Sequence, residues 1–162
     1  YMMLDIPVAE VAELVNNRLN EDNEEELFVT AFLCVLDTVS HRLTYVNAGH
    51  NKPYISRAGA PFSQLECRVD FVLGIMEEMT YTQQETWLGP GERLCLYTDG
   101  VTEAFDTDGE MFGDTGLEKS LNRHMAEAGE PERFIELLYE DVEAFARGAD
   151  QSDDITVVYL AR

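Results

Sequence analysis

Apolar residues recur along this chain with two spacings, one helical and one extended. Helical spacing marks the first segment, where residues 7–20 are predicted to form an amphipathic helix with Pro7 in its first turn. The apolar positions on one side of that helix are Val8, Val11, Val15 and Leu19. The run over residues 27–36 is almost continuously apolar, which is typical of a strand buried on both faces. We therefore expect the helix to lie on a sheet in which residues 27–36 form a central strand.

Turn residues divide the rest of the chain into short strands and two further helices. Residues 37–41 form a predicted hairpin turn after the central strand. The Gly-Pro-Gly turn at 89–91 suggests that the strands on either side of it are neighbours in a meander. Strands are predicted at residues 42–47, 53–57, 79–87, 93–98 and 155–160. Helices are predicted from Asp114 or Thr115 to Met125 and from Pro131 towards Gly148.

This order of elements predicts an α+β fold in which helices cover antiparallel sheets. With 162 residues, 45% of them hydrophobic, the chain is expected to form a single domain, residues 1–162, with a core of its own. Its apolar start, Tyr1 to Leu4, has no lead-in and no obvious partner strand. We expect that the complete protein has further sequence upstream of Tyr1.

Acidic residues outnumber basic ones by 32 to 11, which gives a formal net charge of −21. A surface of this charge repels nucleic acid and anionic membranes, so neither is expected as a partner. It also repels phosphorylated substrates. Any chemistry on phosphate would therefore require bound cations to reverse the local potential.

The cysteine residues indicate the redox conditions in which the protein is expected to fold. Cys34, Cys67 and Cys95 are odd in number, and none has the spacing of a metal-ligand pair. Cys34 and Cys95 lie in apolar strand-like segments, which is typical of reduced, buried thiols in a cytoplasmic protein. The sequence contains neither a signal peptide nor an apolar run of membrane-spanning length, so we expect no direct membrane contact.

Acidic residues stand at the ends of two predicted strands. Asp99 follows the strand 93–98 and precedes Gly100, which allows close approach of backbone and solvent, while Asp153 and Asp154 precede the strand 155–160. If the two strands pair antiparallel, these carboxylates meet at one edge of the sheet. A carboxylate beside an apolar layer must be hydrogen-bonded or metal-bound, which favours a cation site. The alternatives are a turn acid bonded to backbone amides and a solvated acidic pair.

Other polar residues offer weaker candidates. His50, after Gly49, could act as a general acid, although a histidine in this position more often shapes a turn. The segment 106–109 resembles the start of a calcium loop, but the glutamate required at its twelfth position is Leu117, so we predict a plain turn. His41 and His124 are predicted to be turn and exposed-helix residues.

Four segments carry a resemblance to a known family: residues 28–37 (FVTAFLCVLD), 43–54 (LTYVNAGHNKPY), 88–113 (LGPGERLCLYTDGVTEAFDTDGEMFG) and 151–160 (QSDDITVVYL). In this order they resemble the SpoIIE/RsbU-like branch of the metal-dependent protein serine/threonine phosphatases, the protein phosphatase 2C-like family. The resemblance implies an α-β-β-α sandwich of two antiparallel sheets flanked by helices. It also implies a two-metal site for Mn²⁺ or Mg²⁺ at one end of the sheets.

The resemblance assigns roles to individual residues. The metal-binding aspartate of the family's TDG motif falls on Asp99, and the first acid of its closing acidic pair falls on Asp153. Gly100 and Asp154 flank them in supporting positions. The family's GDVSGKG-like segment, which carries another ligand on the first strands, is not found in this sequence. We therefore expect the chain to be the C-terminal, larger part of the domain, lacking its first strands.

The activity implied by the resemblance is hydrolysis of phosphoserine or phosphothreonine on a regulatory protein of the anti-sigma-factor antagonist type, in bacterial signalling and stress response. Carboxylate ligands suit Mn²⁺ or Mg²⁺, and two such ions can neutralise phosphate oxygens and activate water. The family's domains commonly follow sensor or receiver domains, and a homodimer is possible. Two alternatives remain open: a non-catalytic interaction module that keeps the fold without a complete metal site, and an acidic Ca²⁺-binding domain.

Overall fold

The computed structural model describes residues 6–21 and 23–162, which group into two compact units. Unit 1 consists of the described residues within Tyr1–Lys52 and of Glu66–Leu88, and unit 2 of Pro53–Leu65 and Gly89–Arg162. Each unit contains one antiparallel sheet and its own helices. The prediction of antiparallel sheets covered by helices is therefore confirmed. No helix in the described part of the chain is both long and apolar enough to cross a bilayer.

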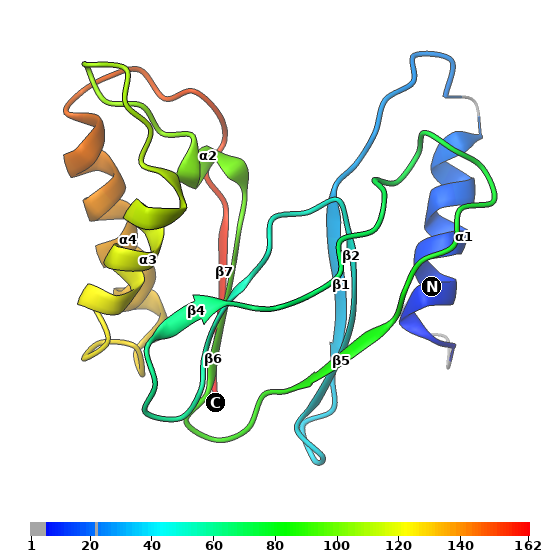
Figure 1. The fold of residues 1–162 in the computed structure, drawn as a ribbon, viewed down its shortest axis with the longest axis horizontal. Coiled ribbons are helices and arrows are strands. Elements are labelled where there is room, and N and C mark those ends of the chain that lie inside the picture. Colours follow the sequence, from blue (N-terminus) through cyan, green and yellow to red (C-terminus); the bar gives the residue numbers. More distant parts are fainter. Residues whose placement is uncertain (1–5, 22) are drawn as a thin grey trace. The chain divides into compact units, whose positions relative to one another are not determined.

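Unit 1 is a three-stranded sheet in the order β1-β2-β5 with one helix packed on it (Figure 1). Its elements are α1 (Val8–Asn20), β1 (Ala31–Leu36), β2 (Arg42–Ala48) and β5 (Gln84–Trp87). The hairpin between β1 and β2 forms as predicted, because Asp37 Oδ1 accepts hydrogen bonds from the backbone of Val39 at 2.9 Å and Ser40 at 3.0 Å. The bonds from Ser40 and Val39 lower the pKa of Asp37 to about 2.

The first helix packs on this sheet as its apolar spacing predicts. Val8 and Ala12 share a core cluster with Val46, Ala48 and Leu73. One predicted position is wrong: Leu19 is 38% exposed, while Asn16 is fully buried on the inner side of the helix. The apolar stripe therefore ends before Leu19, and a polar residue takes the inward position in the last turns.

Two strand predictions in unit 1 need correction. The apolar run 27–36 does not form a central strand: β1 covers only its second half and lies at the edge of the described sheet, whose middle strand is β2. Its side chains are half-buried except that of Val35, which is exposed. The predicted strand 79–87 is regular only from Gln84, where it pairs with β2.

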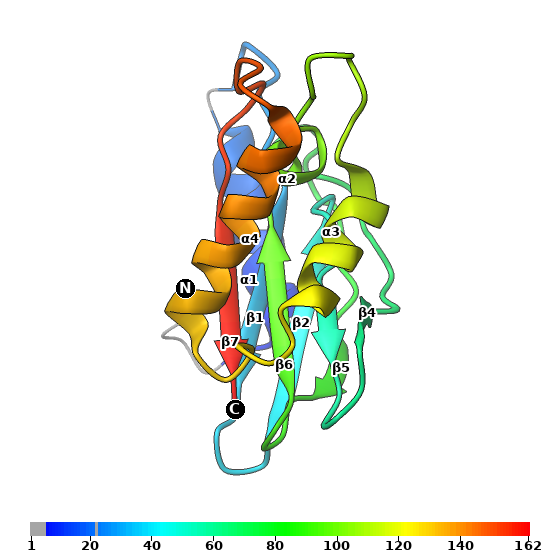
Figure 2. The same cartoon turned by 90° about the vertical axis from the view of Figure 1, so that its left-hand side faces the viewer.

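Unit 2 is a four-stranded sheet in the order β4-β3-β6-β7 with helices on one face (Figure 2). The strands are β3 (Tyr54–Ser56), β4 (Phe62–Gln64), β6 (Arg93–Tyr97) and β7 (Val157–Ala161), and the helices are α2 (Asp99–Thr102), α3 (Gly113–Arg123) and α4 (Pro131–Ala146). The two long helices and the last strand form where the sequence predicts them. Strand β4 was not predicted.

The predicted meander of strands 79–87 and 93–98 is wrong. Strand β5 pairs with β2, whereas β6 pairs with β3 and β7 in the other sheet. The turn at 89–91 does not close a hairpin, because Gly91 N donates to Arg162 O at 2.7 Å and Arg162 N donates to Glu92 O at 3.1 Å. The chain leaving this turn is therefore bound to the C-terminal strand.

Aromatic residues dominate the core of unit 2. Phe134 of α4 stacks on Tyr159 of β7, with ring centroids 4.4 Å apart and an interplanar angle of 27°, and Phe62 of β4 contacts both rings. Cys95 and Tyr97 of β6 lie in the same cluster. Burial raises the pKa of Cys95 to about 12, so the thiol stays protonated and inert. The prediction of a buried thiol is confirmed for Cys95, whereas Cys34 is only half-buried.

Asn16 joins helix α1 to residues 74–81, in the segment that leads into β5. Its Nδ2 donates to Met76 O at 2.7 Å, and its Oδ1 accepts from Gly74 N at 2.9 Å and from the hydroxyl of Tyr81 at 3.1 Å. Gly74 N and the Tyr81 hydroxyl would each lose a buried hydrogen bond if the amide were removed. An unsatisfied buried polar group costs about 1–3 kcal/mol.

We predict that Asn16→Ala lowers the free energy of unfolding by about 3 kcal/mol, because it leaves the buried amide of Gly74 without its partner and removes the bonds to Tyr81 and Met76. The measurement is urea unfolding followed by circular dichroism. Glu10→Ala is the control, since Glu10 lies on the same helix and is exposed; its loss should stay below about 1 kcal/mol. Equal losses in the two variants would contradict the role given to Asn16.

Candidate metal site at the end of strands β6 and β7

The predicted convergence of the two acidic segments is confirmed at the level of the backbone. Strands β6 and β7 pair antiparallel, with Tyr97 opposite Val157. Asp99 follows the last residues of β6, and Asp153 lies just before β7, so both are at the same end of this strand pair (Figure 2). Antiparallel pairing is what brings residues so distant in sequence to one end of the sheet.

Thr98 extends the pairing beyond the two strands. Its backbone N donates to Thr156 O at 3.0 Å, and its Oγ1 accepts from Thr156 N at 2.9 Å. The same hydroxyl donates to Asp154 O at 2.9 Å. One side chain thus bonds to the backbone of the acidic segment at two points, which sets its position relative to Asp99.

Gly100 allows the two segments to touch. A Cβ atom placed on Gly100 would lie 2.5 Å from Asp154 O, which is shorter than any normal contact, and 3.1 Å from Asp153 O, which is tighter than most. Only a residue without a side chain therefore fits against the carbonyl groups of Asp153 and Asp154. The supporting position predicted for Gly100 has this physical basis.

The loop that follows Asp99 is held by hydrogen bonds within itself and by one to the segment that precedes β7. Asp99 O accepts from Glu103 N at 2.7 Å and from the hydroxyl of Thr102 at 3.2 Å. Ser152 Oγ donates to Glu103 O at 2.7 Å, which adds a further bond between the two acidic segments. Thr102, Glu103 and Ser152 thus hold the loop after Asp99 in place through hydrogen bonds.

The carboxylates themselves are exposed to solvent. Asp99 Oδ1 accepts from Gly100 N at 3.1 Å, and Asp153 Oδ1 accepts from Asp154 N at 2.6 Å, so each is oriented by the amide of the next residue. Asp154 is also exposed, and its carbonyl rather than its carboxylate makes the contacts with Thr98 and Gly100.

The donors at this end of the sheet suit a hard divalent cation. Carboxylate oxygens are preferred by Mg²⁺ and Mn²⁺, and Mg²⁺ is commonly held by one or two carboxylates with water in its other positions. Among residues 6–21 and 23–162, no group of three or more His, Cys, Asp or Glu side chains is arranged to hold a metal. Asp99 and Asp153 therefore offer part of a coordination shell, which water and other ligands would have to complete.

The weaker candidates are turn residues. His50 N donates to Asn47 Oδ1 at 2.8 Å after Gly49, whose φ is +70°, so His50 belongs to a tight turn. Asp106 Oδ1 accepts from Asp108 N and Glu110 N, both at 2.9 Å, which forms the plain turn predicted for residues 106–109.

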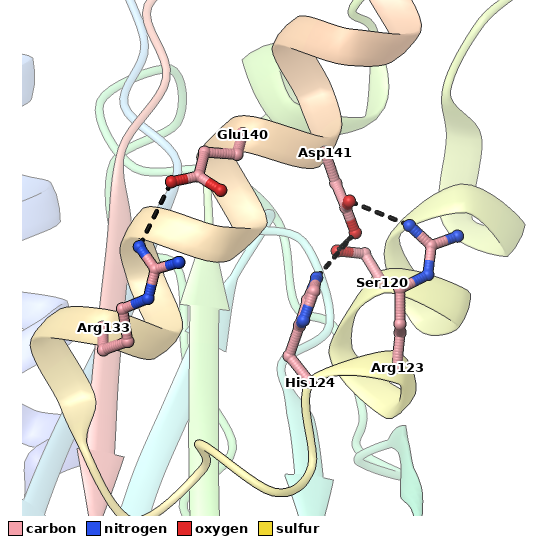
Figure 3. Close-up of polar contacts among 6 residues, drawn as sticks. All are labelled: Ser120, Arg123, His124, Arg133, Glu140 and Asp141. Atoms are coloured by element: carbon pink, nitrogen blue, oxygen red, sulfur yellow. Dashed lines mark hydrogen bonds and ion pairs between the residues drawn. The ribbon is translucent and has the colours of Figure 1, made fainter.

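His124 is not the exposed helix residue that the sequence predicts. It ends α3, with its side chain 15% exposed, and its Nε2 lies 3.0 Å from Asp141 Oδ2. The same carboxylate accepts from Ser120 Oγ at 2.6 Å and from Arg123 at 2.8 Å (Figure 3). Serine, histidine and aspartate meet here without forming a catalytic triad, because Ser120 and His124 bind the same oxygen of Asp141. The cluster joins α3 to α4.

Comparison with known proteins gives a consistent result. The family model described as stage II sporulation protein E (SpoIIE) matches residues 1–162. Protein IcfG of Synechocystis sp. is 30% identical over 142 residues, which cover 88% of this chain and 22% of that protein. Phosphoserine phosphatase RsbU of Bacillus subtilis is 29% identical over 148 residues, which cover 90% of this chain and 43% of that protein. The chain thus spans less than half the length of both relatives.

Solved structures show the same fold. The SiaA-PP2C domain of Pseudomonas aeruginosa superposes with a TM-score of 0.74 at 21% identity, over 90% of this chain and 56% of that one. The manganese-presoaked phosphatase domain of SpoIIE from Bacillus subtilis gives 0.66 at 20% identity, over 98% of this chain and 68% of that one. At these identities the likeness establishes the fold, which is that of the PP2C-type phosphatase domains.

We predict that Gly100→Ala destabilises the protein by about 1–3 kcal/mol, because the new methyl group would force the peptide at Asp153 and Asp154 away from β6. Gly129→Ala is the matched control, since a Cβ at Gly129 meets no atom within 4 Å. Urea unfolding of both variants tests the contact. If Gly100→Ala behaves like the control, the close approach described for Gly100 is wrong.

We predict that Asp141→Asn lowers the free energy of unfolding at pH 7 by about 1–3 kcal/mol. Burial by itself would raise the pKa of Asp141, but the bonds from Ser120 and His124 and the charge of Arg123 outweigh it and lower the pKa below its ordinary value of 3.8. The stabilisation is therefore complete above that value and is lost as the pH falls through the lowered pKa.

The difference between wild type and Asp141→Asn should consequently shrink as urea unfolding is repeated from pH 5 towards pH 3. Glu140→Gln is the control, because its ion pair with Arg133 on the same helix is exposed (Figure 3) and should contribute less than about 0.5 kcal/mol. A difference for Asp141→Asn that stays constant over this range would exclude the ionised carboxylate as its source.

Proposed function

Because the chain belongs to the SpoIIE family and has the fold of the PP2C-type phosphatases, we propose that it hydrolyses phosphoserine or phosphothreonine on a regulatory protein with the help of Mn²⁺ or Mg²⁺. The observation that carries this proposal is the backbone juxtaposition of Asp99 and Asp153 at one end of the β6-β7 pair. A relative named phosphoserine phosphatase, 29% identical over 90% of this chain, supports the choice of substrate group.

In this proposal Asp99 and Asp153 hold the metal. Bound divalent cations would supply positive charge for the phosphate oxygens and a water ionised near neutral pH. Other residues of the chain position these two aspartates. Thr98 and Gly100 keep them on adjacent backbone segments, and Ser152 binds the end of the loop that follows Asp99. Asp154 supports this arrangement through its carbonyl.

The acidic composition makes bound cations necessary for substrate attraction as well as for catalysis. A net charge of −21 opposes the approach of a phosphate dianion, so attraction of the substrate group depends on the bound metal. The same charge raises the local concentration of divalent cations near the exposed aspartates. Binding of metal would therefore precede binding of phosphate in the catalytic cycle.

The finer assignments are carried from the family resemblance. We propose that the target is a small phosphorylated protein of the anti-sigma-factor antagonist type and that activity is controlled by a sensor or receiver domain in the full-length protein, with homodimerisation as part of that control. The solved structure that joins RsbU and RsbW domains in one Mycobacterium tuberculosis protein shares this fold, which makes a signalling context a reasonable starting point.

We predict that Asp99→Asn in the full-length protein reduces Mn²⁺-dependent hydrolysis of an aryl phosphate and of a phosphoserine peptide by more than about a hundredfold, because a neutral amide binds a hard cation far less well than a carboxylate. Mn²⁺ affinity, measured by titration calorimetry, should fall as well. Asp108→Asn is the control, since Asp108 lies in an exposed turn, and it should keep nearly full activity.

Each result decides between functions. Normal turnover in Asp99→Asn would refute the assignment of Asp99 as a ligand. A wild-type protein that folds and binds a regulator but hydrolyses neither compound with Mn²⁺ or Mg²⁺ would instead support the non-catalytic interaction module.

A further inference from the structure

Unit 2 contains a cavity of about 290 Å³ beside the candidate metal site. Its wall comes from the C-terminal half of α4, from the residues after α2 and from the segment that leads into β7. Tyr139, Val142 and Ile155 also line a smaller cavity of about 90 Å³, so the two share an apolar floor. Together they form a hollow that runs along α4, which we call the α4 pocket.

The α4 pocket is built from the same two segments that carry the aspartates. Ala104 and Ser152 both line it. Ala104 follows Glu103, whose carbonyl accepts the Ser152 hydroxyl at 2.7 Å, and Ser152 immediately precedes Asp153. A group bound in the pocket would therefore contact the backbone that positions the candidate metal ligands.

The lining combines apolar and acidic chemistry. Val142 and Ile155 form the floor, and the exposed rings of Phe105 and Tyr139 stand at the wall, 38% and 43% exposed respectively. Aromatic rings left partly exposed around a cavity are typical of surfaces that bind a partner. Glu143 and Asp150, both exposed, provide the carboxylates of the lining.

We propose that the α4 pocket is a specificity site that receives an apolar side chain of the phosphoprotein substrate, with a neighbouring lysine or arginine of that substrate paired to Glu143 and Asp150. This inference rests on the proposed phosphatase function and adds to it the chemistry of the segment next to the phosphorylated residue. The pocket would then select among phosphoproteins, while the metal site acts on the phosphate common to all of them.

Size and charge favour this occupant over others. A volume of about 290 Å³ lies just below the range of about 300–1,000 Å³ usual for small-molecule and cofactor sites, which suits one or two side chains. The acidic lining and the net charge of −21 favour a basic partner and oppose a second copy of this chain. Binding through an apolar anchor also compensates for the repulsion that the acidic surface exerts on phosphate.

The test uses synthetic phosphoserine peptides of one length and the full-length protein. A Leu-Arg pair is placed at successive positions on either side of the phosphoserine, with Ala-Ala and Leu-Glu peptides as comparisons. At the position that reaches the pocket, Leu-Arg should raise kcat/KM at least about tenfold over Ala-Ala, which is the usual discrimination from an apolar side chain in a pocket. An aryl phosphate, too small to reach the pocket, reports on the metal site alone.

Two variants assign the preference to the pocket. Ala146→Phe fills the cavity and should remove the preference for leucine, while Ala144→Phe, on the same helix but outside the α4 pocket, should keep it. Glu143→Lys should remove the preference for Leu-Arg over Leu-Glu, whereas Glu118→Lys makes the same charge change on exposed α3 and should not. Hydrolysis of the aryl phosphate should stay within about twofold in all four variants.

Each outcome is decisive. Unchanged peptide selectivity in Ala146→Phe and Glu143→Lys, with normal turnover of the aryl phosphate, would overturn the specificity site and leave the phosphatase function standing. Loss of aryl phosphate and peptide turnover in the wild type would overturn the proposed function and this inference with it. A change from dimer to monomer in Ala146→Phe, measured by light scattering without any change in selectivity, would show that the pocket holds a second copy instead.

Discussion

The candidate site depends on the close contact between the backbone at Gly100 and the carbonyl groups of Asp153 and Asp154. Carboxylates do not gather spontaneously, because two like charges about 4 Å apart repel by about 1 kcal/mol in water and by about 4 kcal/mol near a protein surface. The pairing of β6 with β7 and the bonds of Thr98 and Ser152 oppose that repulsion, each net hydrogen bond contributing about 1 kcal/mol. The backbone therefore fixes the acidic segments before any cation binds.

This arrangement explains which features could be predicted from the sequence. The acids at Asp99 and Asp153 stand at opposite ends of two apolar strands, so the antiparallel rule alone brings them together. Helix α4 was predictable because Pro131 starts it and its buried positions, Phe134, Leu138 and Val142, recur at helical spacing. In these segments local pattern and tertiary environment agree.

Other features depend on partners that no local pattern reveals. The apolar run 27–36 reads as a central strand, but only the tertiary structure shows that β1 occupies an edge of its sheet. Asn16 appears from its spacing to be a polar position at the side of α1, yet it is buried because Gly74, Met76 and Tyr81 satisfy it from a distant segment. The contact of His124 cannot be predicted from the sequence for the same reason, since its partner Asp141 lies on another helix.

The fold by itself says little about the target of the proposed enzyme, because one fold can carry different sites. In the proposed function, a chain with a net charge of −21 has to bind an anionic group. Metal ions can overcome the repulsion only within a Debye length of about 8 Å at physiological salt, so they act on the phosphate and not on the rest of the substrate protein. Recognition beyond the phosphate must then come from apolar contacts and from basic residues of the partner. The α4 pocket offers both kinds of contact, and its wall includes the residue next to Asp153, so recognition and chemistry would share one short segment of backbone.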